Sequence, residues 1–194
     1  MMTVFAENMG VISVCAYGVR SKKSKLRAAA QPLCFCEFVL SKKQGDIYRV
    51  EAAEILDSFY PISEDIVKLS LANYLCELSR EAFVDGDNSV LSLLLNTLYV
   101  MAYKNVEPIL AKAVFELKLA QYSGYEPVLD ACICCGQAEN LIAFDFSGGL
   151  KCSICQSSAD MNIDVDLINQ NDGYLIIKKE GVNFSVSMEA IKPL

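Results

Sequence analysis

The chain has 194 residues, of which 53% are hydrophobic and 21% are charged. This composition is typical of a globular protein and excludes a disordered one. Nine cysteines occur with no histidine, so a hydrolase that depends on a catalytic histidine is excluded, and any metal site must use thiolates or carboxylates.

Residues 1–56 are predicted mostly as strands. The segments 11–14, 34–40 and 47–50 are rich in β-branched, aromatic and other apolar residues and follow turn or proline signals. Short strands joined by loops predict a small barrel or a curled sheet. The polar, basic segment 20–27 lies between the first two of these strands.

This first part of the chain is basic, although the whole chain has a net charge of −7. Residues 1–50 carry eight Lys and Arg against three Asp and Glu, whereas residues 51–194 carry nine against twenty-one. The asymmetry predicts a module that binds a polyanion, attached to an acidic body. A solvated basic loop without a partner would show the same charges, so both interpretations stay open.

From about Ser63 to Gly124 the hydrophobic period changes to 3.6 residues, which predicts three helices. Ser63 is the predicted cap of the first helix and Asn88-Ser89 of the second, while Pro108 begins the third and Gly124 ends it. Short polar loops between helices of this length predict an antiparallel bundle. The expected buried faces are Val67, Leu71, Tyr74, Leu75 and Leu78; then Val90, Leu94, Leu98 and Met101; then Leu110, Val114, Leu117 and Gln121.

The chain shows neither a membrane span nor a secretory signal. Its longest apolar stretch, residues 89–103, is shorter than the roughly 20 residues that a spanning helix needs, so we expect a buried core helix. Residues 1–8 lack a basic start and an apolar segment. A cytoplasmic protein is therefore expected.

Four cysteines form two C-x2-C pairs, with sixteen residues between Cys135 and Cys152. They are Cys132, Cys135, Cys152 and Cys155. A structural zinc ion takes four tetrahedral ligands, and thiolates suit it. The intervening residues 143–150 are predicted as a strand and a glycine turn that leads back to the second pair. This spacing is typical of a zinc ribbon, and it predicts one structural Zn²⁺ with no open position for water or substrate.

Cys134 lies inside the first pair and competes with Cys135 as a ligand. The Cys132/Cys135 spacing matches that of the second pair, so Cys134 is interpreted as the spare thiol. A redox dithiol is an alternative for either pair, but it leaves the other pair unexplained. The remaining cysteines are expected to be core residues: Cys15, Cys34, Cys36 and Cys76.

The sequence lacks the motifs of common catalytic sites. There is no phosphate-binding G-x-x-x-x-G-K-[ST] loop, no G-x-G-x-x-G and no H-E-x-x-H. Asp164 and Asp166 have the spacing of strand neighbours or of magnesium ligands, but a solvated acidic loop is the simpler interpretation. We therefore predict that the protein is not an enzyme. A β-hairpin is predicted near the end of the chain, in residues 174–177 and 182–186.

Several segments together resemble one protein family. Residues 18–32 resemble the basic loop and following strand of RecO proteins, and residues 45–48 and 54–60 continue the likeness. Residues 124–136 are similar to the family's entry into its zinc finger, and residues 148–152 to its exit. The order of these segments is more specific than any one of them.

The resemblance implies an α+β protein with an OB-like DNA-binding barrel (1–60), a helical domain (61–127) and a four-cysteine zinc finger or ribbon (128–158). The remaining residues, 159–194, are predicted as a hairpin-like tail. The resemblance also implies single- and double-stranded DNA binding, strand annealing, and work with RecR and, in some bacteria, RecF. These proteins help RecA to replace single-strand-binding protein, whose acidic tail many of them contact. Two departures are that members usually carry a barrel strand upstream of Met1 and a helical region past Cys155.

In such a barrel the cations would bind phosphates, and aromatic rings would stack on bases. Phe35 and Tyr48 are the stacking candidates, although Phe35 also fits a core position. The predicted DNA-binding residues are Arg20, Lys22, Lys23, Lys25, Arg27, Lys42, Lys43 and Arg49. The cations available to receive an acidic partner tail are Lys68, Arg80, Lys104, Lys112 and Lys118.

Two other functional classes compete with this interpretation. A zinc-ribbon protein that binds other proteins and not DNA would keep its binding when the basic residues of segment 20–27 are neutralised. A thiol–disulfide oxidoreductase would show a reactive thiol with a low pKa and no bound zinc.

Overall fold

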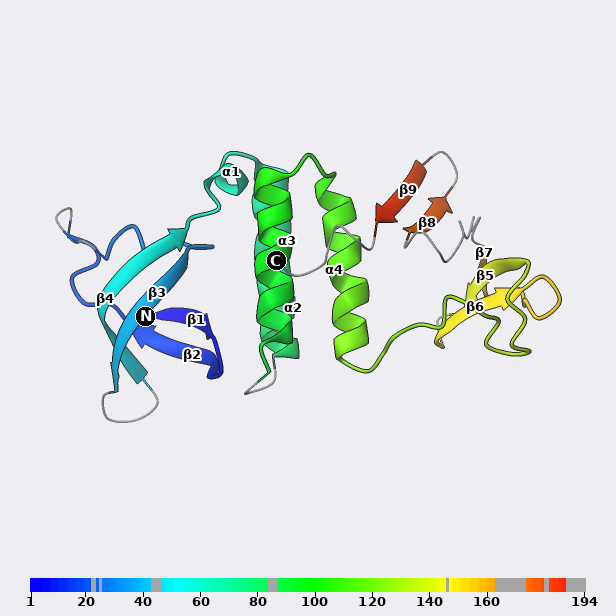
Figure 1. Ribbon diagram of the computed structural model, residues 1–194, viewed down its shortest axis with the longest axis horizontal. Helices are drawn as coiled ribbons and strands as arrows, with labels where there is room; N and C mark the ends of the chain where they lie inside the picture. Colours follow the sequence, from blue (N-terminus) through cyan, green and yellow to red (C-terminus); the bar gives the residue numbers. More distant parts are fainter. Residues whose placement is uncertain are drawn as a thin grey trace. The chain divides into compact units, whose positions relative to one another are not determined.

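The computed structural model describes residues 1–21, 24, 26–42, 47–83, 87–145 and 147–162, together with the backbone of two later strands, 174–179 and 182–187. The chain forms two compact units, Met1–Lys112 and Ala113–Leu194. The boundary lies within the last helix (Figure 1). The division predicted at residues 60, 127 and 158 stays a prediction.

The first unit begins with a four-stranded sheet. Its strands are β1 (Met2–Ala6), β2 (Gly10–Cys15), β3 (Phe35–Lys42) and β4 (Ile47–Asp57), in the order β1-β2-β4-β3. β1 pairs with β2 and β3 pairs with β4 in antiparallel sense, whereas β2 and β4 are parallel. β1 and β3 therefore form the two edges of the sheet.

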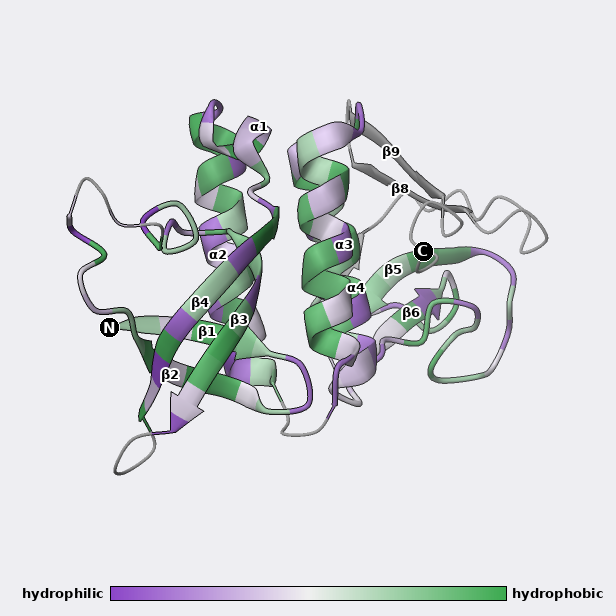
Figure 2. Ribbon diagram, turned by 60° about the vertical axis from the view of Figure 1, so that its left-hand side comes forward, coloured by the Kyte–Doolittle hydropathy of each residue, from purple (hydrophilic) through white to green (hydrophobic). Residues whose placement is uncertain are grey.

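The sheet forms because its apolar side chains alternate along the strands. Ile12, Val14 and Val50 form a buried cluster, against which Val4 of β1 and Phe38 of β3 also pack. Figure 2 shows the alternation of hydrophobic and hydrophilic residues along β3 and β4. One face of the sheet is thus apolar, as a curled sheet requires.

The sequence predicted this sheet incompletely. β1 was not expected, because the first predicted strand began at Val11. In the structure, Met2–Ala6 pairs with β2, and the two strands are joined by a turn in which Asn8 adopts a φ of 59°. The expected α+β class, with strands before helices, is confirmed. Within the described residues β1 and β3 do not pair, so the closed barrel stays a prediction.

Helices follow the sheet, namely α1 (Tyr60–Ser63), α2 (Ile66–Ala82), α3 (Ser89–Tyr103) and α4 (Pro108–Tyr122). α2 and α3 contact each other and run in opposite directions (Figure 1). Among the described residues, no helix combines the length and the apolar character that crossing a bilayer requires.

The helix ends differ in part from expectation. Asp65, and not Ser63, caps α2: its carboxylate accepts hydrogen bonds from the backbone N–H of Val67 at 2.8 Å and of Lys68 at 3.2 Å. Ser63 ends α1 instead. At the end of α4 the prediction is confirmed, since Gly124 has a φ of 77° and its N–H donates to the carbonyl of Gln121.

The predicted buried faces are confirmed for α3 and wrong in part elsewhere. In α3 all four expected residues are buried, and most of the helix is hydrophobic in Figure 2. In α2, Leu75 is buried but Val67 is 52% exposed. In α4 the buried residues include Phe115 and Leu119 in place of Leu117 and Gln121. Both helices therefore bury a stripe that differs from the one their periodicity predicted.

The second unit contains a small sheet after α4. Its strands are β5 (Leu141–Asp145), β6 (Gly149–Cys152) and β7 (Met161–Asn162), in the order β6-β5-β7. A separate antiparallel pair is formed by β8 (Tyr174–Lys179) and β9 (Val182–Ser187). This pair lies within the segment where a hairpin was predicted.

Candidate metal centre and nucleic-acid interface

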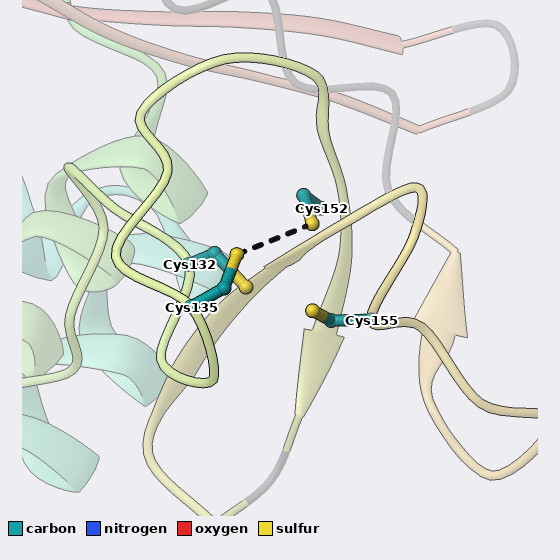
Figure 3. A group of neighbouring side chains, drawn as sticks. All are labelled: Cys132, Cys135, Cys152 and Cys155. Carbon is teal, nitrogen blue, oxygen red and sulfur yellow. Dashed lines mark hydrogen bonds between the residues drawn. The ribbon is translucent and has the colours of Figure 1, made fainter.

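The four cysteines of the two C-x2-C pairs converge in the second unit. Cys132 and Cys135 lie in the loop before β5, whereas Cys152 ends β6 and Cys155 follows it (Figure 3). Each pair is held by a tight turn. The N–H of Gly136 donates to the carbonyl of Cys132 at 2.8 Å, and the N–H of Cys155 donates to that of Cys152 at 3.0 Å.

The sulfur atoms have the spacing of a tetrahedral metal site. All four Sγ atoms lie within 4.8 Å of one another, and Cys135 Sγ is 3.7 Å from Cys152 Sγ. Four sulfurs placed about 2.3 Å from one zinc ion lie about 3.8 Å apart. The donor set therefore fits Zn²⁺. Cys134 is exposed and lies outside this group.

Backbone N–H groups favour thiolates at two of these positions. The N–H groups of Cys152, Cys135 and Cys134 lower the pKa of Cys132 to about 6. Burial alone would raise the pKa of Cys152, but hydrogen bonds from the N–H groups of Cys155 and Ile154 and from the Cys155 and Cys135 side chains outweigh it, and the pKa is lowered. Negative sulfur is therefore stabilised at Cys132 and Cys152, whereas hydrogen bonds with Cys152 and Cys135 raise the pKa of Cys155.

Close backbone packing brings the second pair to the first. Gly149 begins β6, and a Cβ at this position would collide with the carbonyl oxygen of Val128 and lie 2.8 Å from Ile133 Cγ2. Leu150 donates its N–H to the same Val128 carbonyl at 2.8 Å. Only glycine permits this approach, so Gly149 allows β6, which ends at Cys152, to pack against the segment that carries Cys132.

An ion-pair triad joins the hairpin to the segment after the second pair. Lys151 Nζ lies 2.5 Å from Asp145 Oδ2 and 3.2 Å from Asp160 Oδ1, and its side chain is only 12% exposed. Hydrogen bonds from Lys151 and Ser147 hold the pKa of Asp145 well below its usual range. The triad fixes residues on both sides of Cys152.

The predicted DNA-binding cations divide into two sets. Lys22, Lys23, Lys25 and Lys43 lie outside the described residues. Arg20, Arg27 and Lys42 are exposed, and Arg49 is partly buried. The structure therefore locates half of the predicted cations, all of them in the first unit.

Two of the cations lie beside aromatic rings where β2, β3 and β4 meet. The guanidinium carbon of Arg49 lies 5.1 Å from the ring centre of Tyr17, and Lys42 Nζ lies 6.0 Å from that of Tyr48. Strand register creates this arrangement, because Lys42 pairs with Tyr48 and the next residue of β4, Arg49, pairs with Cys15 of β2. Tyr48 and Arg49 are neighbours in β4, so the two pairs lie on opposite faces of the sheet. We call the pairs Tyr17–Arg49 and Lys42–Tyr48 together the cation–aromatic cluster.

Sequence reasoning missed Tyr17, although it is 56% exposed. It lies two residues past β2, and no sequence signal shows that the β2–β4 pairing brings it to Arg49. Phe35, the other proposed stacking residue, begins β3, whereas Lys42 ends it. Phe35 is thus not part of the cation–aromatic cluster.

Two of the helical cations also lie over tyrosine rings. Lys104 Nζ is 5.5 Å from the ring centre of Tyr99, and Lys112 Nζ is 5.3 Å from that of Tyr74. Arg80 is paired with Glu81 at 3.2 Å. These contacts give two positions where a cation adjoins an exposed aromatic surface.

Two of the cysteines outside the metal site, Cys36 and Cys76, have raised pKa values. Burial, together with a hydrogen bond to Cys34, raises the pKa of Cys36 to about 12. Burial also raises the pKa of Cys76 to about 11. Both thiols therefore stay protonated at neutral pH. The four cysteines expected to be core residues, Cys15, Cys34, Cys36 and Cys76, are all only partly buried, so this role stays a prediction.

Comparison with known proteins identifies relatives along the chain. Residues 1–59 match the family described as "Recombination protein O N terminal", and residues 63–170 match "Recombination protein O C terminal". The "DNA repair protein RecO" of Caldicellulosiruptor bescii is 35% identical over 173 residues, covering 87% of this chain and 70% of that protein. The protein of the same name from Alkaliphilus metalliredigens is 35% identical over 184 residues, covering 92% and 74%.

Proposed function

The chain belongs to the RecO family of DNA repair proteins, and from this membership we propose that it acts in recombinational repair by binding and annealing single-stranded DNA. Double-stranded DNA is bound through the same phosphate contacts. Annealing needs no nucleotide hydrolysis, because neutralising two phosphate backbones at once removes the main barrier to their approach. The protein is thus proposed to act without catalysing a reaction.

The cation–aromatic cluster is the observation that carries this proposal. Cations give affinity for phosphates without sequence preference, and aromatic faces stack on any base. Arg49 beside Tyr17 and Lys42 beside Tyr48 supply both kinds of group at one end of the sheet, one pair on each of its faces. Arg20 and Arg27 are exposed in the segment that precedes β3 and add two cations to the first unit.

Zinc has a structural role in this proposal. Cys132, Cys135, Cys152 and Cys155 would hold one Zn²⁺ in a ribbon, which ties the loop before β5 to the end of β6. The ion supplies folding energy and no reaction chemistry, because four thiolates fill its coordination sphere.

Protein partners complete the proposed role. RecR, RecA and, in some bacteria, RecF are the partners that family membership implies. Single-strand-binding protein is the protein that RecA replaces on the DNA. The acidic, apolar tail of that protein needs a cation next to an apolar surface. Lys104 beside Tyr99 and Lys112 beside Tyr74 meet this requirement.

A second candidate function is protein binding by the ribbon without DNA. The observation that favours it is Ile154, which lies between Cys152 and Cys155 and is 83% exposed. An exposed apolar side chain in the turn between two metal ligands suits a protein contact. This candidate predicts no measurable affinity for DNA.

Fluorescence anisotropy of a labelled single-stranded oligonucleotide, titrated at several salt concentrations, tests the DNA proposal. About five phosphate contacts predict a slope of log K against log salt near −3.5. The double variant Lys42→Gln/Arg49→Gln should weaken binding and make the slope shallower by about 1.4.

Lys118→Gln is the matched control, because it removes the same kind of charge from α4, where Lys118 contacts only a neighbouring glutamine in the described contacts. It should leave the slope unchanged. Equal slopes for all three proteins would remove the cation–aromatic cluster from the interface. No binding at low salt would favour the ribbon-only function.

A further inference from the structure

A second pair of neighbouring thiols lies in the first unit, outside the metal site. Cys34 directly precedes β3, and Cys36 is the second residue of that strand. Residues two positions apart in an extended chain point to the same side of the sheet. The two side chains therefore meet, and Cys36 Sγ lies 3.4 Å from Cys34 Sγ.

The backbone before β3 leaves room for the two sulfur atoms to approach further. Leu33 has a φ of 61°, so the chain turns immediately before Cys34. The pairing of β3 with β4 begins at Phe35, so Cys34 lies outside the ladder. A disulfide needs sulfur atoms about 2.05 Å apart, which is about 1.4 Å closer than the two thiols are now. Cys34 can move by this amount without breaking a hydrogen bond of the strand ladder.

The pair suits oxidation better than metal binding. Two thiols at this separation either share a soft metal ion or form a disulfide. Among the described residues, the only group of three or more Cys, His, Asp or Glu side chains with the spacing of a metal site is the four-cysteine centre. Cys34 and Cys36 therefore have no further donor of this kind beside them in the described part of the chain.

The two sulfurs differ in their readiness to react. Burial, together with the hydrogen bond to Cys34, raises the pKa of Cys36 to about 12. Cys36 has one hydrogen atom to donate, and Cys34 Sγ at 3.4 Å and the Ala29 carbonyl at 3.8 Å are its two acceptors. The attacking group in thiol–disulfide exchange is a thiolate. Cys36 is therefore the second sulfur to react, and Cys34, which is partly exposed, is the first.

We propose that Cys34 and Cys36 form a reversible oxidation site that exchanges with a small disulfide such as oxidised glutathione. The Cys34 thiolate attacks one sulfur of the oxidant, forms a mixed disulfide and releases one glutathione thiolate. Cys36 then gives up its proton, and its sulfur attacks Cys34 Sγ and releases the second glutathione. The two cysteines lose two electrons and two protons, which the oxidant takes up to become two molecules of reduced glutathione.

The proposed disulfide should be easy to reduce. It closes a loop of only three residues, so it removes little conformational entropy from the unfolded chain and adds little stability. Both cysteines are only partly buried, and accessible disulfides are the labile ones. The proposal rests on this thiol pair alone and does not depend on DNA binding.

Mass spectrometry of the zinc-loaded full chain tests the proposal. The protein is incubated with oxidised glutathione, unfolded in iodoacetamide to alkylate every free thiol, and digested with trypsin. Residues 28–42 form one tryptic peptide, which contains Cys34 and Cys36 and no other cysteine. We expect most of this peptide to lack alkylation and to be lighter than the dithiol form by two hydrogen atoms.

Cys76 is the internal reference. It is the only cysteine of the tryptic peptide 69–80, and burial raises its pKa to about 11. Because its thiolate is scarce at neutral pH, it should escape the oxidant and be alkylated in most molecules. An excess of reduced glutathione, added before alkylation, should return the peptide 28–42 to its doubly alkylated form.

Two serine variants separate the roles of the two sulfurs. Cys36→Ser should accumulate a glutathione adduct on Cys34, because no second thiol resolves it. Cys34→Ser should form an adduct on Cys36 about tenfold more slowly than that, or more slowly still, because the Cys36 thiolate is scarce. Cys15→Ser, in β2, is the matched control and should leave the disulfide of the peptide 28–42 unchanged.

Three results would overturn the proposal. The first is full alkylation of Cys34 and Cys36 after incubation with oxidised glutathione. The second is a stable glutathione adduct on Cys34 in the unchanged protein, since Cys36 would then fail to resolve it. The third is a disulfide that joins either cysteine to Cys76 in place of its neighbour.

Discussion

Asn8 and Asn88, eighty positions apart, form a reciprocal pair of hydrogen bonds. The N–H of Asn8 donates to Asn88 Oδ1 at 2.9 Å, and Asn88 Nδ2 donates to Asn8 Oδ1 at 3.0 Å. Asn8 lies in the turn between β1 and β2, whereas Asn88 directly precedes α3. The pair therefore fastens the edge of the sheet to the helical part of the first unit.

This pair should be measurable as a coupling energy. Asn8→Gly removes the side chain but keeps the φ of 59° that the turn requires, and Asn88→Ala removes both bonds. We expect a coupling of about 0.5–1 kcal/mol in a double-mutant cycle of urea unfolding, because an exposed hydrogen bond stabilises a protein less than a buried one. Additive effects of the two substitutions would mean that the side-chain bond contributes nothing.

The cap of α2 gives a second prediction. Asp65→Ala should lower the free energy of unfolding by about 0.5–2 kcal/mol, because two N–H groups of the first turn lose their acceptor. Asp65→Asn should lose much less. Ser63→Ala is the control, since Ser63 bonds only within α1 in the described contacts. A larger loss of stability at Ser63 than at Asp65 would show that Ser63 caps the helix, as the sequence predicted.

Gly149 gives a third prediction, on the ribbon. Gly149→Ala should destabilise the second unit by about 1–3 kcal/mol, because the new Cβ meets the Val128 carbonyl and that backbone has to shift. Limited proteolysis and zinc content should both report the damage. Ser158→Ala, which lies in the same unit, is exposed and makes no side-chain hydrogen bond among the described contacts, should behave as the unchanged protein. Full zinc content and resistance to proteolysis in the Gly149 variant would contradict the packing argument.

The metal site gives a fourth prediction. The purified protein should hold one zinc ion per chain, and cobalt substitution should give the visible bands of a tetrahedral thiolate site. Cys135→Ser should lose the ion, whereas Cys134→Ser should retain it, because Cys134 lies outside the sulfur group. Retention in the Cys135 variant with loss in the Cys134 variant would reverse the ligand assignment.

Local sequence signals predicted the features that depend on neighbouring residues. The spacing of the C-x2-C pairs was enough to bring Cys132 and Cys152 into one group, because each tight turn is local and a single hairpin joins them. The end of α4 at Gly124 was predicted for the same reason. These features need no knowledge of distant contacts.

Features that depend on long-range pairing were missed. β1 is a short strand without a strong pattern, and it forms because β2 supplies its partner. Tyr17 joins Arg49 only because β2 and β4 pair in parallel. The shift from Ser63 to Asp65 arises because α1 ends at Ser63 and a new helix starts after it. Tertiary context overrides local propensity at each of these positions.

The first unit is proposed to bring DNA strands together through its cations. The most direct measurement is annealing of two complementary oligonucleotides that carry a donor and an acceptor dye, followed by energy transfer without any nucleotide. We expect that the protein accelerates annealing, that Lys42→Gln/Arg49→Gln slows it, and that Lys118→Gln does not. Annealing at the spontaneous rate with the unchanged, zinc-loaded protein would show that the first unit does not bring DNA strands together.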